Sequence, residues 1–320
     1  MKAIRVHEFG APEVMKLEEI PTPKPGAGQV LVRVHAAGVN PYEGYQRAGT
    51  YAIKPNLPYT PGSDAAGVVE AVGEGVTKVK TGERVYTART LSGSYAEYTL
   101  VAQSMAQPLP EKISFEQGAS VWVPCGTAYH ALYHSAHAHA SETVLVHGAS
   151  GGVGIATVQL ARAMGLTVFG TAGTAKGLEL VIREGAHRAF DHSKSGYTDE
   201  ILAATGGPGV DIVVEMLANV NLPADMKLLA TNGRIIVVGN RGEVTINARE
   251  LMARRASMRG FTLWALTEPE TADVHAGLHA AMENGTLRPV IGKKIPLAEA
   301  ARAHTEIMQP GAHGKIVLIP

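Results

Sequence analysis

A glycine-rich run over residues 148–154, Gly-Ala-Ser-Gly-Gly-Val-Gly, carries the strongest chemical signal in the sequence. A short apolar stretch precedes it at residues 143–147, and residues 152–164 continue with apolar side chains at helical spacing. Glycines at a strand-to-helix turn let backbone N–H groups approach a pyrophosphate, which the positive end of the helix dipole also stabilises. In the G-x-G-x-x-G pattern, Ala149 takes the place of the first glycine. The run predicts a dinucleotide-binding turn.

The same residues also match the nucleophile elbow of hydrolases, G-x-S-x-G, with Ser150 at its centre. A serine nucleophile needs a histidine base and an acidic residue on later strand ends. Asp211 starts its predicted strand instead of ending it, and Glu215 has no evident partner. The dinucleotide interpretation is therefore favoured, and a fluorophosphonate label on Ser150 would separate the two.

The end of the next predicted strand indicates which dinucleotide is bound. NAD enzymes usually place Asp or Glu there to bind the ribose 2′-hydroxyl. Here residues 169–176 read Phe-Gly-Thr-Ala-Gly-Thr-Ala-Lys, without a carboxylate. Small residues leave room for a 2′-phosphate, which Lys176 can meet as a point charge, although an exposed helix lysine would look the same. The sequence predicts NADPH in preference to NADH.

Alternating strands and helices surround this turn over residues 119–266. Such short buried strands imply a parallel sheet covered on both faces, and six of them suit a doubly wound Rossmann fold. We expect strands at residues 143–147, 167–171, 189–190, 210–215, 234–239 and 258–263, and helices at 152–164, 175–184, 198–205 and 223–230.

The chain before residue 119 has a different pattern. Alternating runs at residues 29–35, 65–73 and 94–101 are separated by prolines and glycines, which is typical of a β-rich domain. After residue 266 come two predicted helices, at 272–284 and 298–308, and a strand at 315–319, too few for a third domain. We expect residues 1–118 and 267–320 to form one discontinuous domain, into which the α/β domain of residues 119–266 is inserted.

Composition and charge exclude several classes of function. One cysteine rules out an intrachain disulfide, a multi-cysteine zinc lobe and an iron–sulfur cluster. Basic and acidic residues balance at 29 each, which disfavours nucleic acid and membrane surfaces as partners. No apolar run reaches the roughly 18 residues of a spanning helix, and residues 1–10 lack a signal peptide's apolar core. We expect a soluble, cytoplasmic protein.

A set of histidines and the single cysteine could also carry chemistry. His130, His134 and His137 fall on one predicted helix at spacings of four and three, with His139 beyond. They could form a metal patch, but solvated helix positions are the commoner explanation. Cys125 could be a nucleophile, but its place at the entrance to a helix favours a packed, non-catalytic thiol.

Several longer strings resemble a known family nearly from end to end. They place the chain beside the zeta-crystallin-like quinone oxidoreductases of the medium-chain dehydrogenase/reductase superfamily. The resemblance implies a GroES-like catalytic domain, a Rossmann domain, and NADPH in the cleft between them. The strings are Ala37-Gly-Val-Asn-Pro41, Tyr59-Thr-Pro-Gly-Ser-Asp-Ala-Ala-Gly67, Gly93-Ser-Tyr-Ala-Glu-Tyr98, His147-Gly-Ala-Ser-Gly-Gly-Val-Gly154, Gly170-Thr-Ala-Gly-Thr174 and Glu215-Met-Leu-Ala-Asn-Val-Asn221.

The resemblance also implies which residues contact the cofactor. Tyr45 resembles the tyrosine that approaches the nicotinamide end, and Thr127 offers a cofactor-side hydroxyl. Asn240 stands where relatives often have serine. The implied contacts are Ser150, Gly151, Gly152 and Val153 at the pyrophosphate; Gly173, Lys176 and His192 at the adenosine end; Asn221, Val238, Gly239, Asn240 and Arg241 after the fourth and fifth strands; and Phe261, Thr262 and Leu263 beside the nicotinamide.

Zinc-dependent alcohol dehydrogenases belong to the same superfamily. Their catalytic zinc uses a cysteine and a histidine–glutamate pair, where this sequence has Asn40 and the pair Ser63 and Asp64. Without a Lewis acid an alkoxide is poorly stabilised, so alcohol oxidation is disfavoured. A quinone needs less help, because its reduced form is a stabilised phenolate. The resemblance therefore implies NADPH-dependent, zinc-free reduction of a quinone or a similar conjugated carbonyl.

Asn40, Tyr45 and Tyr51 resemble residues that the family places near the acceptor. An amide or hydroxyl could hydrogen-bond a quinone oxygen and a tyrosine could donate a proton, but shaping the pocket is the simpler role. We expect no single essential acid. Two alternatives stay open: reduction of an alkenal or enone double bond, and a recruited binding or structural role, because relatives serve as lens crystallins and RNA binders.

The resemblance also implies a homodimer or a homotetramer. The apolar sixth predicted strand, at residues 258–263, could pair with its copy across a two-fold axis to form a continuous sheet.

Overall fold

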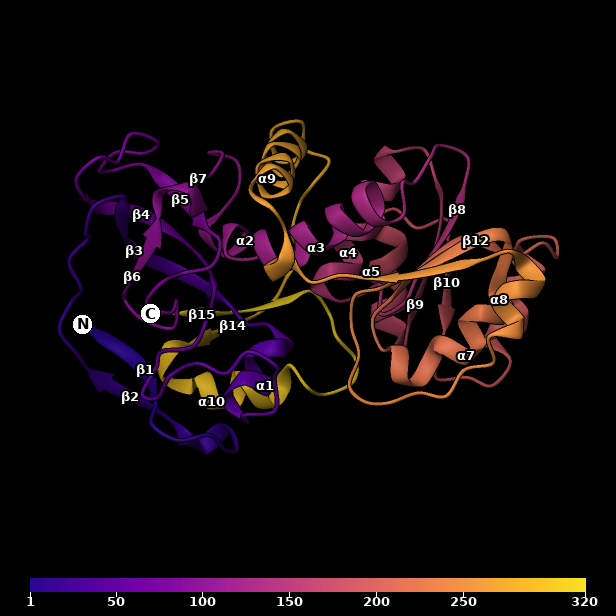
Figure 1. The fold of residues 1–320 in the computed structure, drawn as a ribbon, viewed down its shortest axis with the longest axis horizontal. Coiled ribbons are helices and arrows are strands. Elements are labelled where there is room, and N and C mark those ends of the chain that lie inside the picture. The colour runs from indigo at the N-terminus through magenta and orange to yellow at the C-terminus, as the bar shows by residue number, and fades with distance from the viewer. The chain divides into compact units, whose positions relative to one another are not determined.

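The computed structural model describes all 320 residues, and the chain divides into two compact units (Figure 1). Unit 1 consists of residues 1–123, 288–310 and 314–320. Unit 2 consists of residues 124–287 and 311–313. No helix has both the length and the apolar character needed to cross a membrane.

Unit 1 is built on a seven-stranded sheet in the order β14-β15-β3-β4-β5-β7, with β6 paired to β3, beside a two-stranded sheet of β1 and β2. β3 is its central strand and exposes only Arg33 and His35. The elements are β1 (Lys2–Val6), β2 (Met15–Glu19), β3 (Gln29–Gly38), β4 (Asp64–Val72), β5 (Arg84–Thr87), β6 (Tyr98–Ala102), β7 (Ala106–Pro108), β14 (Ile291–Pro296) and β15 (Lys315–Ile319), with α1 (Pro41–Arg47), α2 (Phe115–Gly118) and α10 (Ala300–Glu306).

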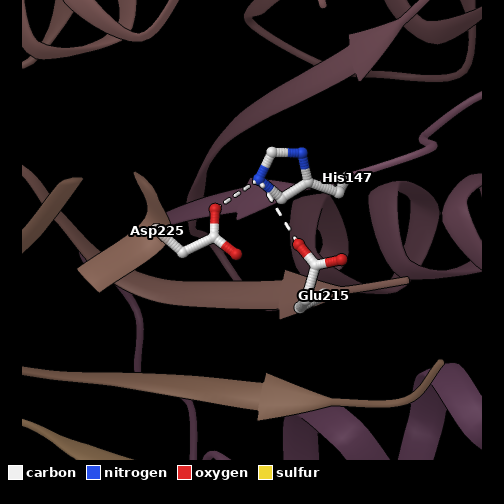
Figure 2. Close-up of side chains that lie close together, drawn as sticks. All are labelled: His147, Glu215 and Asp225. Carbon is white, nitrogen blue, oxygen red and sulfur yellow. Dashed lines mark hydrogen bonds and ion pairs between the residues drawn. The ribbon is translucent and has the colours of Figure 1, made fainter. Parts of the chain in front are cut away.

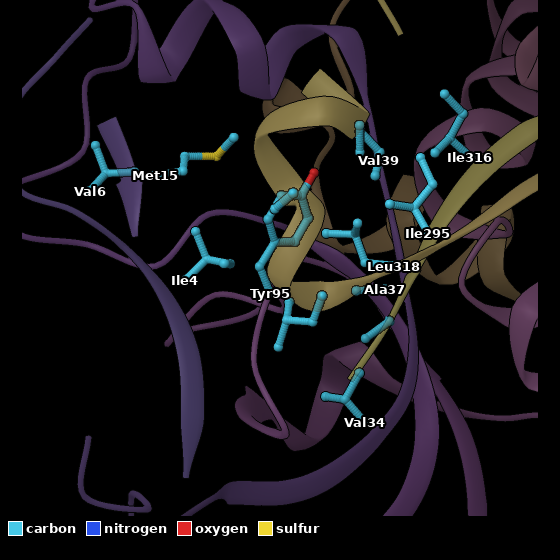
Figure 3. Close-up of a cluster of buried hydrophobic side chains, with 14 residues drawn as sticks. Ile4, Val6, Met15, Val34, Ala37, Val39, Tyr95, Ile295, Ile316 and Leu318 are labelled. Atoms are coloured by element: carbon cyan, nitrogen blue, oxygen red, sulfur yellow. The ribbon is translucent and has the colours of Figure 1, made fainter. Parts of the chain in front are cut away.

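The core of unit 1 joins parts of the chain that are far apart in sequence. Ile4 and Val6 from β1 pack in one buried cluster with Val34 from β3 and Leu318 from β15. Figure 3 shows Tyr95 in the middle of these side chains. Burial of this apolar surface, worth about 25 cal/mol per Å², holds the late strands β14 and β15 to the first part of the chain.

Unit 2 contains a six-stranded, fully parallel sheet in the order β10-β9-β8-β11-β12-β13. This is the strand order of a doubly wound Rossmann fold, as the sequence predicts. The elements are β8 (Thr143–Val146), β9 (Thr167–Ala172), β10 (Arg188–Asp191), β11 (Val210–Glu215), β12 (Leu229–Val237) and β13 (Ser257–Gly260), with α3 (Thr127–Tyr129), α4 (Gly152–Ala163), α5 (Ala175–Arg183), α6 (Tyr197–Ala204), α7 (Ala218–Leu228), α8 (Arg249–Arg254) and α9 (Glu268–Glu283).

The structure differs from the expected domain boundaries in three places. Residues 119–123 belong to unit 1, whereas residues 311–313 and one helix, expected in the first domain, belong to unit 2. Residues 267–287 were assigned to the first domain, but α9 belongs to unit 2. Val274, Leu278 and Met282 on this helix are buried. Gly277 lies so close to the ring of Tyr129 that a Cβ atom there would come within 2.3 Å of it. The helix therefore packs closely within unit 2.

Several predicted elements of unit 2 have different bounds. β12 covers Leu229–Val237 where a strand was predicted at 234–239, and two further differences concern a helix and the last strand. α7 begins at Ala218, not at residue 223, because Pro223 lies inside the helix and not in its first turn. The predicted strand 258–263 is shorter, since β13 ends at Gly260. All four residues of β13 are exposed, and it forms an edge of the sheet. The apolar character of residues 258–263 therefore does not reflect a buried strand.

Candidate active site

The glycine-rich run forms the turn between β8 and α4. Gly148 has a φ of +55°, a left-handed conformation that favours glycine. The N–H of Gly151 donates to the carbonyl oxygen of Gly148 at 3.0 Å, and Gly151 caps α4 without a side-chain hydrogen bond. A Cβ atom on Gly154 would lie 2.4 Å from that same carbonyl oxygen. The first-turn N–H groups of α4, which have no acceptor within the helix, are thus suited to an anion such as a pyrophosphate.

Ser150 lies within this turn, but its hydroxyl is committed. It donates to the carbonyl oxygen of Ala312 at 2.6 Å, and the side chain is buried. The neighbouring His147 directs its ring nitrogens to Asp225 and to Thr171 instead. No general base therefore contacts Ser150, and the nucleophile-elbow interpretation is wrong.

The residues predicted at the adenosine end gather where β9 ends. Thr174 caps α5 by accepting from the N–H of Gly177 at 3.1 Å, so exposed Lys176 lies in the first helical turn. Gly173 faces the ring of His192, because a Cβ atom at residue 173 would lie 2.8 Å from His192 Nε2. The structure thus brings Gly173, Lys176 and His192 to one edge of the sheet, where glycine keeps the backbone accessible.

A second group lies at the ends of β11 and β12. The N–H of Ala218 donates to Gly239, and a Cβ atom on Gly239 would lie 2.2 Å from the carbonyl oxygen of Met216. The two loops are therefore in close contact. The predicted contacts here are Asn221 in the first turn of α7, whose amide donates to Glu215; Val238 and Gly239; Asn240, whose amide donates to Gly242; and Arg241, whose N–H donates to Asn219.

The last predicted contacts lie beyond β13 and near α3. The ring of Phe261 packs on that of His130, with centroids 4.1 Å apart. Leu263 is buried, whereas Thr262 is exposed and Thr127 is half-buried at the start of α3. Residues 261–263 thus follow β13 instead of forming part of it.

In unit 1, Asn40 belongs to a buried hydrogen-bonded cluster. Its side-chain amide donates to Glu43 Oε1 at 3.3 Å and to Asp64 Oδ2 at 3.1 Å. Its carbonyl oxygen accepts from the ammonium of Lys315. Asn40 is 1% exposed, so both amide hydrogens and the oxygen are used within the protein. The sequence identified Asn40 as a pocket residue but missed two of its partners. Glu43 is the capping-box partner of Asn40, three residues further along the chain, and Lys315 lies far away in sequence, on β15.

Burial perturbs the ionisable groups of this cluster. It raises the pKa of Asp64 to about 7, although the Lys315 ammonium opposes that change. Burial likewise raises the pKa of Glu43, which accepts from the hydroxyl of Tyr95 at 2.7 Å. The same hydroxyl lies 3.1 Å from His304 Nε2, whose pKa falls to about 3 through burial and through the charge of Arg47.

Tyr45 and Tyr51, the other two pocket candidates, lie near the end of α1. The N–H of Tyr51 donates to the carbonyl oxygen of Tyr45 at 3.2 Å, and both side chains are half-buried. The ring of Tyr51 lies 5.7 Å from that of Tyr42, whose hydroxyl donates to Ser63 at 2.8 Å. A tyrosine-lined turn thus borders the Asn40 cluster.

The donor set around Asn40 does not fit a catalytic zinc. A zinc site of this type needs three protein ligands with free lone pairs. Of the three positions that match the zinc ligands of relatives, Ser63 is bonded to Tyr42, Asn40 is bonded to two carboxylates and an ammonium, and only Asp64 carries a usual ligand atom. Lys315 Nζ lies 3.9 Å from Asp64 Oδ2, and its positive charge would repel a divalent cation.

The histidines near α3 do not converge on a metal. His130 is buried beside the hydroxyl of Ser135, and burial lowers its pKa to about 4. His134 Nε2 lies 2.8 Å from Asp273. His137 has a φ of +47° and lies beyond the helix that was predicted to carry it. The solvated-helix interpretation is therefore wrong for His130. Cys125 is buried, as a packed thiol would be.

One polar cluster in unit 2 was missed by the sequence analysis (Figure 2). His147 Nε2 lies 2.7 Å from Asp225 Oδ1 and 3.6 Å from Glu215 Oε2. The three residues come from the end of β8, the end of β11 and the middle of α7, and all are buried. His147 directly precedes the glycine-rich run, and Glu215 begins one of the family strings, but nothing in the sequence singles out Asp225.

Comparison with known proteins agrees with this geometry. A family model described as an alcohol dehydrogenase GroES-like domain matches residues 26–111, and one described as a zinc-binding dehydrogenase matches residues 152–278. The chain is 53% identical over its full length to the human quinone oxidoreductase, of which it covers 98%. The chain belongs to the quinone oxidoreductase family. The predicted resemblance is thereby confirmed.

More distant family members agree. A quinone oxidoreductase of Pseudomonas aeruginosa is 33% identical over the whole chain and 99% of that protein. The crystal structure of the Escherichia coli quinone oxidoreductase complexed with NADPH superposes with a TM-score of 0.90 at 29% identity, covering all of both chains. The predicted fold class, a GroES-like domain with a Rossmann domain, is confirmed. The zinc-binding description fits the family model but not the ligand set of this member.

Proposed function

We propose that this quinone oxidoreductase family member reduces quinones, or similar conjugated carbonyls, with NADPH and without a metal. The observation that carries the proposal is the Lys315 ammonium, which donates to Asn40 where zinc-dependent relatives hold their metal. The charge of this buried ammonium opposes the binding of a divalent cation, which is the Lewis acid that would stabilise an alkoxide. A quinone accepts hydride without a Lewis acid. As part of this proposal, the acceptor binds between the two domains, as the family resemblance implies.

NADPH supplies a hydride when it is bound. The N–H groups of Gly151, Gly152 and Val153 at the start of α4 are suited to hold its pyrophosphate. Lys176, in the first turn of α5, is placed to meet the 2′-phosphate, and no carboxylate at the end of β9 would repel it. What supports this assignment is the uncapped first turn of α4 and the NADPH-bound relative.

The acceptor would lie beside Tyr45 and Tyr51. Asn40 serves as a fixed wall and not as a free donor, because its amide is committed to Glu43, Asp64 and Lys315. Water supplies the proton, so Tyr51→Phe retains turnover. Loss of turnover in that variant, with NADPH binding unchanged, would identify Tyr51 as an essential acid and contradict this part of the proposal.

The test is steady-state oxidation of NADPH against ortho-quinones and para-quinones, with alkenals and enones as the second panel. We expect higher kcat/KM with quinones, no effect of chelators, and no stoichiometric metal in the purified protein. Detection of a semiquinone signal would show whether electrons pass singly. Preference for alkenals would favour double-bond reduction instead, and chelator-sensitive alcohol oxidation would overturn the metal-free proposal.

A further inference from the structure

A chain of polar contacts joins Glu215 to the glycine-rich turn. Asp225 Oδ1 lies 2.7 Å from His147 Nε2, and His147 Nδ1 lies 3.3 Å from the hydroxyl of Thr171. That hydroxyl accepts from the N–H of Gly148 at 3.3 Å. Gly148 is thus linked, through the side chains of Thr171, His147 and Asp225, to the Glu215 carboxyl at the end of β11.

The two carboxyl groups in this chain cannot both be ionised at low cost. Asp225 Oδ2 is buried and accepts no hydrogen bond from a conventional donor. Figure 2 shows this oxygen on the side of Asp225 that faces Glu215. Glu215 Oε1 accepts from the N–H of Leu217 and from the amide of Asn221. One ligand atom each of His147, Glu215 and Asp225 lies within 4.8 Å of the others, and a side-chain hydrogen bond joins the two carboxyls. Because an ionised carboxylate only accepts hydrogen bonds, this bond requires a proton on one of the pair.

Other ionisable groups face the pair from the surrounding elements. His147 at the end of β8 touches both carboxyls, and Tyr197 on α6 lies close enough to act on them electrostatically. His192, which follows β10, also joins these polar contacts, because its Nδ1 lies 3.2 Å from the hydroxyl of Thr171. Burial keeps the pKa of His147 below its usual range, and the same holds for His192, so neither provides a permanent positive charge.

We propose that Glu215 and Asp225 share one proton, and that this proton holds the glycine-rich turn in the state that binds the cofactor's pyrophosphate. Glu215 and Asp225 are positioning residues, because they act through His147, Thr171 and Gly148. Loss of the shared proton places a second buried negative charge behind a turn that must receive an anion. The inference rests on the pyrophosphate site proposed above.

The perturbed acidities agree with this arrangement. Burial raises the pKa of Glu215 to about 8 and that of Asp225 to about 7. A bound anion raises the pKa of a nearby carboxyl further, so NADPH binding takes up a proton above pH 7 and affinity falls as pH rises. The 2′-phosphate of NADPH titrates near pH 6, below this window.

Fluorescence titration with NADPH between pH 7 and pH 9 tests the inference. We expect the Kd of the wild-type protein to rise about five- to tenfold over this range, as a pKa increase of one to two units requires. Glu215→Gln keeps the acceptor oxygen for Leu217 and Asn221 and donates permanently to Asp225. Its Kd should therefore stay within about twofold over the whole range. The exposed residue Glu200 gives the matched control, Glu200→Gln, which should keep the wild-type dependence.

Calorimetry in two buffers of different ionisation enthalpy gives an independent measurement on the wild-type protein. At pH 8, binding should take up about 0.4 proton per NADPH. No uptake, or a Glu215→Gln variant with the wild-type pH dependence, would overturn the shared proton. The purified protein could also hold one metal ion per chain that Glu215→Gln loses. A cation and not a proton would then lie between the carboxyls, which would also overturn the proposal. Absence of NADPH binding at every pH would instead refute the cofactor site itself.

Discussion

The hydroxyl of Ser150 donates a 2.6 Å hydrogen bond to the carbonyl oxygen of Ala312, joining residues 162 positions apart. Ala312 belongs to the three-residue segment 311–313 that is part of unit 2, although the residues on both sides of it belong to unit 1. This contact fixes one side of the turn that we assign to the pyrophosphate. Ser150 therefore has a structural role that its motif does not reveal.

Ser150→Ala should weaken cofactor binding without abolishing the reaction. The variant loses one hydrogen bond, worth about 1 kcal/mol, and leaves the carbonyl of Ala312 without this donor. We expect the KM for NADPH to rise about fivefold, as a loss of that size implies, with kcat within about twofold. Steady-state kinetics beside the exposed control Ser104→Ala measures this. A collapse of kcat would give Ser150 a chemical role after all.

Lys315→Met should destabilise unit 1. Asp64 and Glu43 would keep their buried positions but lose the nearby ammonium, and removing one partner of a buried ion pair typically costs about 3–5 kcal/mol. Urea unfolding measures the loss. Asp64→Asn in the same chain should recover part of it, because it removes the carboxylate that was left unpaired. Strictly additive effects of the two substitutions would contradict this coupling.

Lys176→Ala should change cofactor preference. In the proposed cofactor site its ammonium meets the 2′-phosphate, a group that NADH lacks. We expect the Kd for NADPH to rise about tenfold or more, as for loss of a hydrogen bond to a charged group, while the Kd for NADH stays constant. Lys78→Ala, an exposed lysine of unit 1, is the control. Equal effects on both cofactors would place the 2′-phosphate elsewhere.

The buried His304 should make the protein less stable in acid. Its pKa of about 3 in the folded state lies below the 6.5 of the free side chain, so only the unfolded chain binds this proton near pH 5. Stability from this group is present above about pH 6.5 and is lost as pH falls toward 3, by about 2 kcal/mol between pH 6.5 and 5. Buried carboxyls with raised pKa values make the folded protein more stable as the pH falls, which is the opposite effect. The contribution of His304 is therefore measured as the difference between the wild type and His304→Gln. As the pH falls, the unfolding free energy of this variant should rise relative to that of the wild type. If the two proteins have parallel pH profiles of unfolding free energy, the prediction is wrong.

The exposed edge strand β13 predicts a homo-oligomer. All four of its residues are exposed, and Met258 is 40% exposed. The backbone groups on the outer side of β13 have no partner strand within the sheet. Pairing with a copy of itself would satisfy them. Light scattering should give a mass of at least two chains, and Met258→Lys should lower it. A wild-type monomer would contradict this expectation.

Much of unit 2 could be predicted because its signals are local. β11 has the predicted bounds, residues 210–215, since Gly209 with a φ of +95° breaks the chain just before an apolar run. α7 was predicted too short, because a proline usually marks the first turn of a helix and Pro223 instead lies inside it. Tertiary packing of the helix overrides that local preference.

The polar clusters could not be predicted, because each depends on tertiary contacts. Lys315 and Asn40 meet only because β15 pairs with the end of β3, and single-sequence patterns do not report such pairing. Likewise, Asp225 looks like an ordinary helix residue until the fold places it against His147. The sequence identified the glycine-rich turn from its own residues, but not the carboxyls that stand behind it.

The return of the chain to unit 1 after residue 287 also constrains how the protein is made. Residues 124–287 are nearly all of unit 2 and emerge from the ribosome as one continuous stretch, so they can fold as soon as they are synthesised. The first 123 residues must wait for β14 and β15 before their sheet is complete, and meanwhile one side of β3 lacks its neighbour. We therefore expect residues 1–123, and not residues 124–287, to depend on chaperones during synthesis.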